Sequence, residues 1–152
     1  MYNLILDTNV LIDALSDYQS PTWQILNMIK SADVKFFASY KILKEYQLII
    51  DRQVVKEKDK QILQKFISQV EAVNVRNQVK AVKWDPEDDK FINAALSAKA
   101  QYIISSDSHL LELGEYGNIK ILSPKDFLFL YKGQKDESGK QEWADIFSNI
   151  FK

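Results

Sequence analysis

Two aspartates, Asp7 and Asp107, each follow a short apolar run near a pair of turn-forming residues. Asp7 comes directly after residues 4–6, and Asp107 comes after residues 102–104 and two serines. Runs this short favour buried parallel strands, and an apolar helical pattern follows each aspartate. Alone, Asp7 would be explained as a helix cap. The recurrence instead indicates half of a metal site, because ligands of open α/β sheets bind at the carboxyl ends of the strands.

Two further groups of acids lie at predicted helices. Glu45 falls within a helix predicted for residues 40–51, on the side of its apolar stripe. A solvated charge and a cation-bound carboxylate both explain it. Asp85, Asp88 and Asp89 surround Pro86 at the start of another helix, where acids favour the helix dipole. That structural explanation is complete, but this helix leads directly into the strand that presents Asp107.

Collected at one edge, these carboxylates would form a site for divalent metal. The candidate set is Asp7, Glu45, Asp89 and Asp107, with Asp85 and Asp88 as near alternatives. Four clustered carboxylates repel one another unless cations neutralise them. One or two Mg²⁺ or Mn²⁺ ions would do so, and could then hold a phosphodiester, activate water and stabilise the leaving oxygen. Asn9 and Ser105 can orient carboxylates or water around such ions.

Composition narrows the chemistry and the setting. The 152 residues suggest one domain, and the chain lacks cysteine, which excludes disulfides and thiolate sites. A single histidine, His109, disfavours a zinc site. We find no membrane-spanning stretch and no signal-peptide pattern, so we expect a cytoplasmic protein with no membrane partner. The net charge of −1 means that any affinity for nucleic acid must come from a local patch.

Strand and helix patterns alternate along the chain. Short apolar runs at residues 34–38, 102–106 and 119–122 alternate with helical patterns, and a weaker strand is predicted at 72–75. This alternation predicts a mostly parallel sheet with helices on both faces. We expect one domain over residues 1–131. Residues 132–152 are predicted to be a polar linker and an amphipathic tail that contacts the body, a partner or a second copy.

A basic run is the main candidate for contacts with phosphates. Five basic and two acidic side chains lie between Arg52 and Lys65, a net charge of +3 (5 − 2). Such a run is also typical of a solvated helix face. The residues expected to contact RNA are Arg52, Lys56, Lys58 and Lys60.

The acids and their order resemble those of PIN-domain proteins, the metal-dependent ribonuclease fold of VapC-type toxins. The family's signature first strand resembles Leu-Asp-Thr-Asn-Val-Leu-Ile at residues 6–12. Its second acid is a Glu in the helix after the second strand, as Glu45 is. Its third acid precedes an alanine-rich helix, and its fourth follows a strand and a small hydroxyl residue, as Asp107 follows Ser105. The resemblance covers roughly residues 1–131.

This resemblance implies a fold, an activity and partners. The fold would be a three-layer α/β/α sandwich with a mostly parallel sheet. The activity would be Mg²⁺- or Mn²⁺-dependent hydrolysis of RNA by the toxin of a type II toxin–antitoxin pair, with an antitoxin partner and a homodimer. Asp89 and Asp107 match the family's spacing (107 − 89 = 18), although the adjacent Asp88 leaves the third acid ambiguous by one position.

Two other classes of function remain open from the sequence. A catalytically silent binding module of the same fold is one, although such modules lose the acids that this chain keeps. A phosphoaspartate protein, either a phosphatase or a receiver, is the other. That phosphatase class has a second Asp two residues after the first, where this chain has Asn9, and the strand around Phe37 ends in Ser39 where a receiver has Asp.

Overall fold

A mostly parallel sheet forms the centre of the structure, a computed structural model that describes residues 1–82 and 85–136. The described residues form six strands in the order β3-β2-β1-β4-β6-β5. Every neighbouring pair is parallel except β5 and β6, which are antiparallel. The strands are β1 (Tyr2–Leu6), β2 (Val34–Ser39), β3 (Glu71–Val73), β4 (Tyr102–Ile104), β5 (Glu115–Tyr116) and β6 (Ile119–Leu122).

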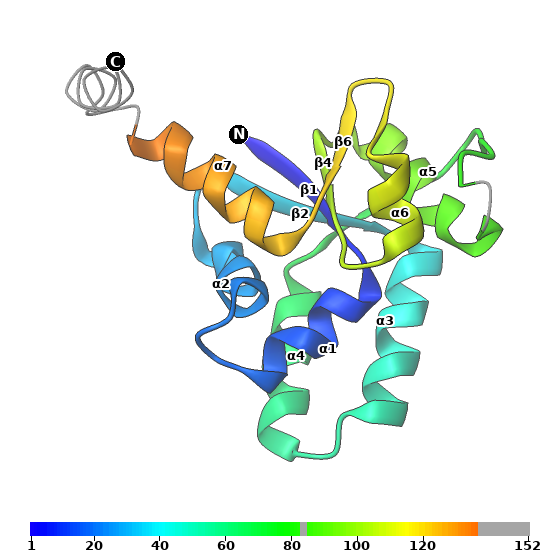
Figure 1. Ribbon diagram of the computed structural model, residues 1–152. Helices are drawn as coiled ribbons and strands as arrows, with labels where there is room; N and C mark the ends of the chain where they lie inside the picture. Colours follow the sequence, from blue (N-terminus) through cyan, green and yellow to red (C-terminus); the bar gives the residue numbers. More distant parts are fainter. Residues whose placement is uncertain (83–84, 137–152) are drawn as a thin grey trace.

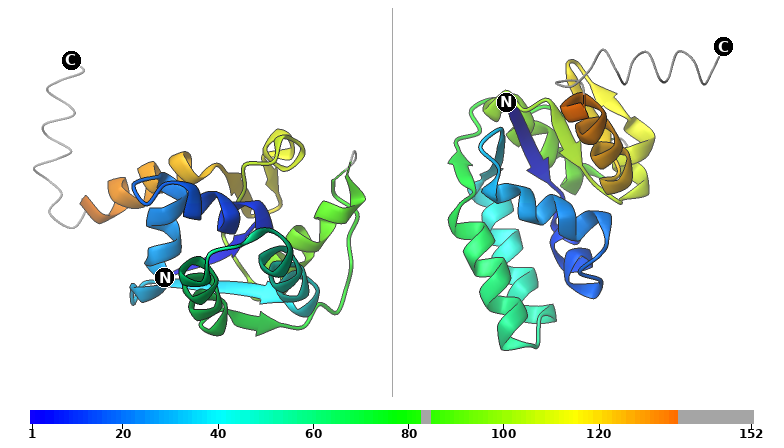
Figure 2. Two further views of the ribbon diagram at one scale, coloured as in Figure 1. Left: turned by 90° about the horizontal axis from the view of Figure 1, so that it is seen from below. Right: turned by 90° about the vertical axis from the view of Figure 1, so that its left-hand side faces the viewer.

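Helices cover both faces of this sheet. Helix α5 packs on one face against β1, β2 and β4, whereas α1, α2 and α7 pack together on the other (Figures 1 and 2). This arrangement confirms the predicted α/β/α sandwich. The helices are α1 (Thr8–Ser16), α2 (Pro21–Asn27), α3 (Tyr40–Gln53), α4 (Glu57–Ser68), α5 (Asp89–Ala98), α6 (Ser108–Leu113) and α7 (Pro124–Asp136), with short 3-10 turns η1 (Met28–Lys30) and η2 (Pro86–Asp88).

Side-chain caps start helices directly at three strand ends. Asp7 accepts from the Asn9 amide after β1, at 3.4 Å, and Ser39 accepts from the Ile42 amide after β2, at 3.2 Å. Asp107 accepts from the His109 amide after β4, at 2.7 Å. Because β1, β2 and β4 are parallel neighbours, these caps bring the starts of α1, α3 and α6 to one edge of the sheet.

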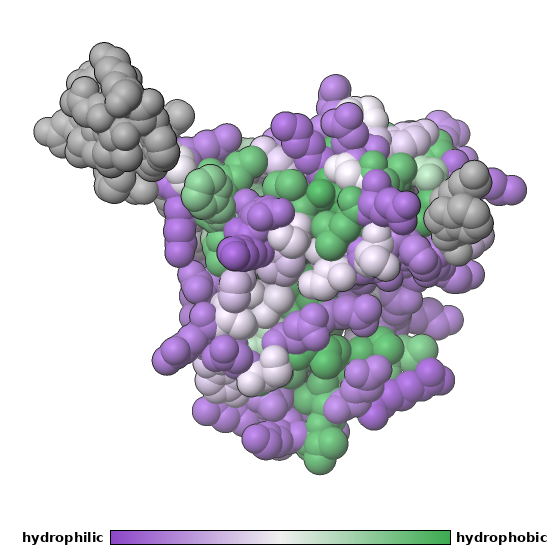
Figure 3. Space-filling model, viewed as in Figure 1, coloured by the Kyte–Doolittle hydropathy of each residue, from purple (hydrophilic) through white to green (hydrophobic). Residues whose placement is uncertain are grey.

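Helices α3 and α4 extend from the sheet as an arm whose tip joins them at residues 54–56 (Figure 1). The aromatic core beneath the sheet includes Phe36 and Phe66, whose rings lie edge to face at 5.2 Å between centroids. Two apolar side chains of the arm remain exposed, Leu48 by 45% and Val55 by 88%. Hydrophobic surface follows the arm toward its tip (Figure 3).

The C-terminal prediction needs a correction. The structure continues α7 to Asp136, whereas the sequence predicts a polar linker from Lys132. The extra turn is held by the hydroxyl of Tyr2, which donates to Gln134, and just before this turn the hydroxyl of Tyr131 donates to Asp33. The amphipathic tail predicted beyond it, over residues 137–152, lies outside the described residues. The sequence pattern also misses the short strand β5. No helix in the described part of the chain is long and apolar enough to cross a membrane.

Tyr46 fixes α3 to the end of β1, because its buried hydroxyl donates to the Leu6 carbonyl at 2.5 Å. We expect Tyr46→Phe to lower the free energy of unfolding by about 1–2 kcal/mol, the usual cost of losing a buried hydrogen bond. Urea denaturation of both proteins measures this. Tyr40→Phe, at a side chain that is 66% exposed, is the control and should change little. An equal loss in both variants would contradict the structural role of Tyr46.

Candidate functional site

Five carboxylates gather at the carboxyl edge of the sheet, and we call them the acid cluster: Asp7, Glu45, Asp85, Asp88 and Asp107. Their charges act on one another. Asp107 and Glu45 both raise the pKa of Asp7, and Asp107, Asp85 and Asp7 all raise that of Asp88. The structure therefore brings together three of the four acids predicted as catalytic, namely Asp7, Glu45 and Asp107. It also brings in Asp85 and Asp88, which were predicted as near alternatives.

Ser105 links the two strand-end aspartates. Its hydroxyl donates to Asp7 Oδ2 at 2.7 Å and accepts from the Asp107 amide at 2.9 Å. Asp7 is only 5% exposed, and this burial raises the pKa of its carboxyl, although the hydrogen bonds from Ser105 and from the Asn9 amide oppose the rise. Ser105 thus orients both carboxylates. Asn9 contributes through its backbone amide, and the residue itself is exposed.

Asp88 interacts with the acid cluster, whereas Asp89, the residue chosen from spacing, binds the backbone of a loop. Asp89 Oδ1 accepts from the amides of Ala81 and Val82 at 2.8 and 2.7 Å, so this carboxylate holds a loop against the start of α5. Asp88 instead interacts electrostatically with Asp7 and Asp107. Successive residues near the start of a helix point in different directions, by about 100°. The two neighbouring aspartates consequently serve different purposes.

The environment of Asp88 fits a cation. The side chain is 9% exposed, and its Oδ2 is a buried oxygen without a hydrogen-bond partner in the described part of the chain. Burial and the nearby Asp107, Asp85 and Asp7 raise its pKa to about 7, whereas Lys90 opposes the rise. A buried carboxylate with an unpartnered oxygen is costly unless a positive charge compensates it. The oxygen ligands of Asp7, Asp88 and Asp107 are of the type that Mg²⁺ and Mn²⁺ bind.

Glu45 already has partners in the protein. Lys90 Nζ lies 2.6 Å from Glu45 Oε1, and the Thr8 hydroxyl donates to Oε2. The sequence left open whether Glu45 is a solvated charge or a carboxylate with a cation as its partner. The structure supplies a lysine ammonium, 8% exposed, from the first turn of α5. The role of Glu45 as a metal ligand, which the resemblance implies, stays a prediction.

Among the described residues, one group has its ligand atoms close enough together to hold a metal ion, and it shares Asp85 and Asp107 with the acid cluster. One ligand atom each of Asp85, Asp107 and His109 lies within 4.8 Å of the others. Asp85 is the N-cap residue of the following turn but makes no side-chain cap hydrogen bond there. Sequence reasoning did not select His109. The available signal was its position two residues after Asp107, where the first turn of α6 keeps the two side chains close.

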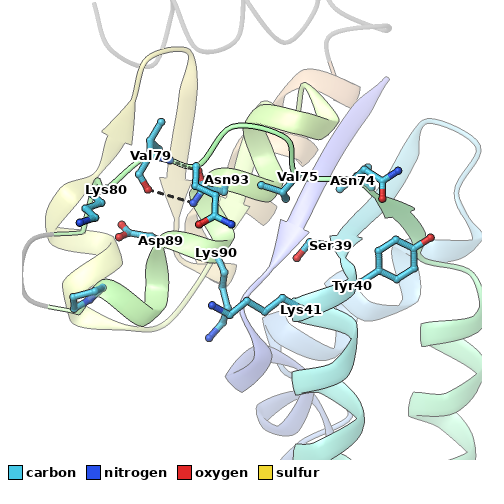
Figure 4. A pocket seen from close by; sticks show the side chains of 13 residues that line it. Ser39, Tyr40, Lys41, Asn74, Val75, Val79, Lys80, Asp89, Lys90 and Asn93 are labelled. Atoms are coloured by element: carbon cyan, nitrogen blue, oxygen red, sulfur yellow. Dashed lines mark hydrogen bonds between the residues drawn. The ribbon is translucent and has the colours of Figure 1, made fainter.

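A cavity of about 440 Å³ lies next to Lys90, between the ends of β2 and β3 and the start of α5 (Figure 4). Asn93 ties one wall to α5: its Oδ1 accepts from the Val79 amide at 2.7 Å, and its Nδ2 donates to the Val79 carbonyl at 3.3 Å. Three lysines line this cavity, and none of them was among the predicted RNA contacts: Lys41, Lys80 and Lys90.

The predicted basic run lies elsewhere. Its four residues occupy the end of α3, the loop at the tip of the arm and the first turn of α4, and none lines the cavity: Arg52, Lys56, Lys58 and Lys60. Lys58 Nζ lies over the ring of Tyr18, at 5.8 Å from its centroid. Among the cavity lysines, Lys90 contacts the acid cluster directly through Glu45.

The raised pKa of Asp88 predicts a pH-dependent stability. Its folded-state pKa of about 7 exceeds the reference value of 3.8, so between these values the folded chain binds more protons than the unfolded chain. Stability of the metal-free protein should therefore fall as the pH rises from about 4 to about 7. Thermal melting at pH 5 and pH 7.5 in EDTA measures this, and Mn²⁺ should restore stability at the higher pH.

Asp88→Asn should flatten this dependence and raise the melting temperature at pH 7.5, because the substitution removes a buried charge. Asp13→Asn, at an exposed position on α1, should leave the dependence as it is. A slope that is equal in the wild type and in Asp88→Asn would show that Asp88 does not carry this unfavourable charge.

Solved structures share this fold at low sequence identity. VapBC2 from Rickettsia felis, crystallised with a DNA fragment from its promoter, matches with a TM-score of 0.53 and 16% identity, over 78% of this chain and 96% of that chain. The PIN domain of T. brucei RRP44 matches with a TM-score of 0.44 and 14% identity, over 98% of this chain and 88% of that chain. No curated protein matches the sequence significantly.

The sequence itself matches a family model. The model describes the PIN domain and matches residues 3–109, well over half of the chain. The matched range includes all five residues of the acid cluster, together with Ser105 and Lys90. This chain belongs to the PIN domain family.

Proposed function

We propose that this protein is a metal-dependent endoribonuclease, the toxin of a type II toxin–antitoxin pair. The observation that carries the proposal is the buried, unpartnered oxygen of Asp88, a carboxylate that interacts electrostatically with Asp7 and Asp107 at the carboxyl edge of the sheet. Metal-dependent hydrolysis of phosphodiesters requires such a set of oxygen ligands. The PIN family match supports this reading of the cluster and disfavours the phosphoaspartate alternative.

In this proposal Asp7, Asp88 and Asp107 hold Mg²⁺ or Mn²⁺. When bound, the ion supplies charge stabilisation to the phosphate and lowers the pKa of water. Ser105 keeps Asp7 and Asp107 in a fixed relative orientation through its two hydrogen bonds. His109 and Asp85 extend the ligand set outward, and an imidazole favours a transition metal such as Mn²⁺ over Mg²⁺.

The RNA would run from the acid cluster toward the cavity. The lysines at positions 41, 80 and 90 line that cavity and provide the positive charge that the net charge of −1 does not. Exposed Tyr40 lines it as well and offers an aromatic ring for base stacking. Single-stranded RNA is the substrate that fits, because its bases are free to stack.

We further propose an antitoxin partner and a homodimer. A VapBC2 complex is among the structures with this fold, and the arm of this chain exposes Leu48 and Val55. Apolar side chains exposed on one element often mark a protein contact. An RNA substrate and an antitoxin place the proposed activity in the cytoplasm. Light scattering of the purified chain tests the dimer directly.

Cleavage of labelled single-stranded RNA tests the function. With Mn²⁺ the wild type should cut, and with EDTA it should not. Asp7→Asn and Asp88→Asn should each lower the rate at least about 100-fold, because each removes a metal ligand worth several kcal/mol. Asp89→Asn is the matched control. It should keep most of the activity, because an amide oxygen can still accept the loop hydrogen bonds.

Two outcomes would contradict the proposal in different ways. Loss of activity in Asp89→Asn with full activity in Asp88→Asn would make Asp89 the third acid. An absence of cutting under every condition, together with no binding of Mn²⁺ in calorimetric titration, would indicate a silent binding module of the PIN fold.

A further inference from the structure

Lys90 is a nearly buried cation at the edge of the acid cluster. Its side chain is 8% exposed, and its ammonium lies 2.6 Å from Glu45 Oε1. Lysine is almost never buried without a charged partner, so this ion pair is what permits the ammonium to lie there. The sequence places Lys90 directly after Asp88 and Asp89, so the start of α5 brings acidic side chains and a basic side chain to the same edge of the sheet.

Both oxygens of Glu45 are occupied by protein groups. Oε1 receives Lys90, and Oε2 receives the hydroxyl of Thr8. A divalent ion bound to Glu45 would lie close to the Lys90 ammonium, and the two positive charges would repel strongly at such short range. Asp88 shows the opposite condition, because its buried Oδ2 has no hydrogen-bond partner in the described part of the chain. The two sides of the cluster thus differ in what they can still bind.

We propose that Lys90 takes the place of a second metal ion beside Glu45, so that Glu45 holds a lysine while Asp7, Asp88 and Asp107 hold metal. This inference rests on the proposed nuclease function and specifies its site. Glu45 then acts as a positioning residue that keeps the ammonium at a fixed distance from the metal ligands. An ammonium has three donors, and Glu45 occupies one of them.

The remaining donors of the Lys90 ammonium can reach a substrate in the cavity. Lys90 lines it together with Lys41, and Figure 4 shows both side chains on the same side of that space. A phosphate that passes from the acid cluster into the cavity would therefore meet the ammonium of Lys90. A fixed ammonium supplies one positive charge there without needing free metal.

Calorimetric titration with Mn²⁺ tests the proposal without measuring activity. Lys90→Met should bind one more Mn²⁺ per chain than the wild type, because removal of the ammonium frees Glu45. The extra ion should disappear in the double variant Lys90→Met/Glu45→Gln. The count is relative to the wild type, so binding at the outer group of Asp85, Asp107 and His109 does not affect the comparison.

Control variants separate the charge of Lys90 from other effects. Lys44→Met removes a lysine from α3 that lines neither the cavity nor the acid cluster, and it should leave the Mn²⁺ count unchanged. Lys90→Arg keeps a cation and should keep the wild-type count. Glu45→Gln alone should change the Mn²⁺ affinity less than about threefold, whereas Asp88→Asn should weaken it more than about tenfold. Thermal melting of each metal-free variant checks that it folds, and the neutral variant Lys90→Gln serves if Lys90→Met does not fold.

The possible results distinguish this inference from the function on which it rests. Equal Mn²⁺ counts in the wild type and Lys90→Met would overturn the role of Lys90 while leaving the nuclease intact. A loss of metal affinity in Glu45→Gln as large as that in Asp88→Asn would make Glu45 a metal ligand and would also overturn it. No Mn²⁺ binding by the wild type would instead refute the proposed function itself, and this inference with it.

Discussion

The structure at the carboxyl edge of the sheet depends on holding several carboxylates close together, two of them buried. Asp7 and Asp88 are both nearly inaccessible, and burial raises the pKa of each. The fold supplies two partial remedies, the hydroxyl of Ser105 on Asp7 and the ammonium of Lys90 on Glu45. Neither reaches Oδ2 of Asp88. Binding of a cation would relieve the remaining unfavourable energy, and this relief is the physical basis of the metal binding that we propose.

The elements that carry these acids could be predicted because each rule involved is local. A short apolar run that ends in a capping residue marks a strand followed by a helix, and this pattern alone places Asp7 and Asp107 at one edge of the sheet. The alternation of such units also predicts the α/β/α layers. Strand β5 could not be predicted because two residues carry no periodicity. The extra turn of α7 could not be predicted because a contact with Tyr2, distant in sequence, holds it.

The details of the site depend on the directions of side chains and on contacts between residues far apart in sequence. The spacing of residues in the sequence does not specify either of them. Asp88 and Asp89 are chemically identical neighbours, and only the turn of the chain at the start of α5 decides which one faces Asp7. The pair of Glu45 and Lys90 joins residues far apart in sequence, as the Tyr46 contact with Leu6 does. The cavity lysines likewise come from α3, from the loop after β3 and from α5. The composition of the sequence instead favoured the denser basic run of the arm as the site of RNA contacts.

The hydrogen bonds of Asp89 have a consequence for how this family's sequences are interpreted. Its carboxylate fastens the loop at Ala81 and Val82 to the turn that aims Asp88. A shorter side chain at that position would release the loop and turn its neighbour away from the ligands. In a scan by alanine replacement, Asp89 would then score like an active-site acid through its hold on the loop alone. A position in this segment at which substitution abolishes activity can therefore act by orienting a neighbouring side chain. Catalytic roles have to be assigned from the contacts that each side chain makes.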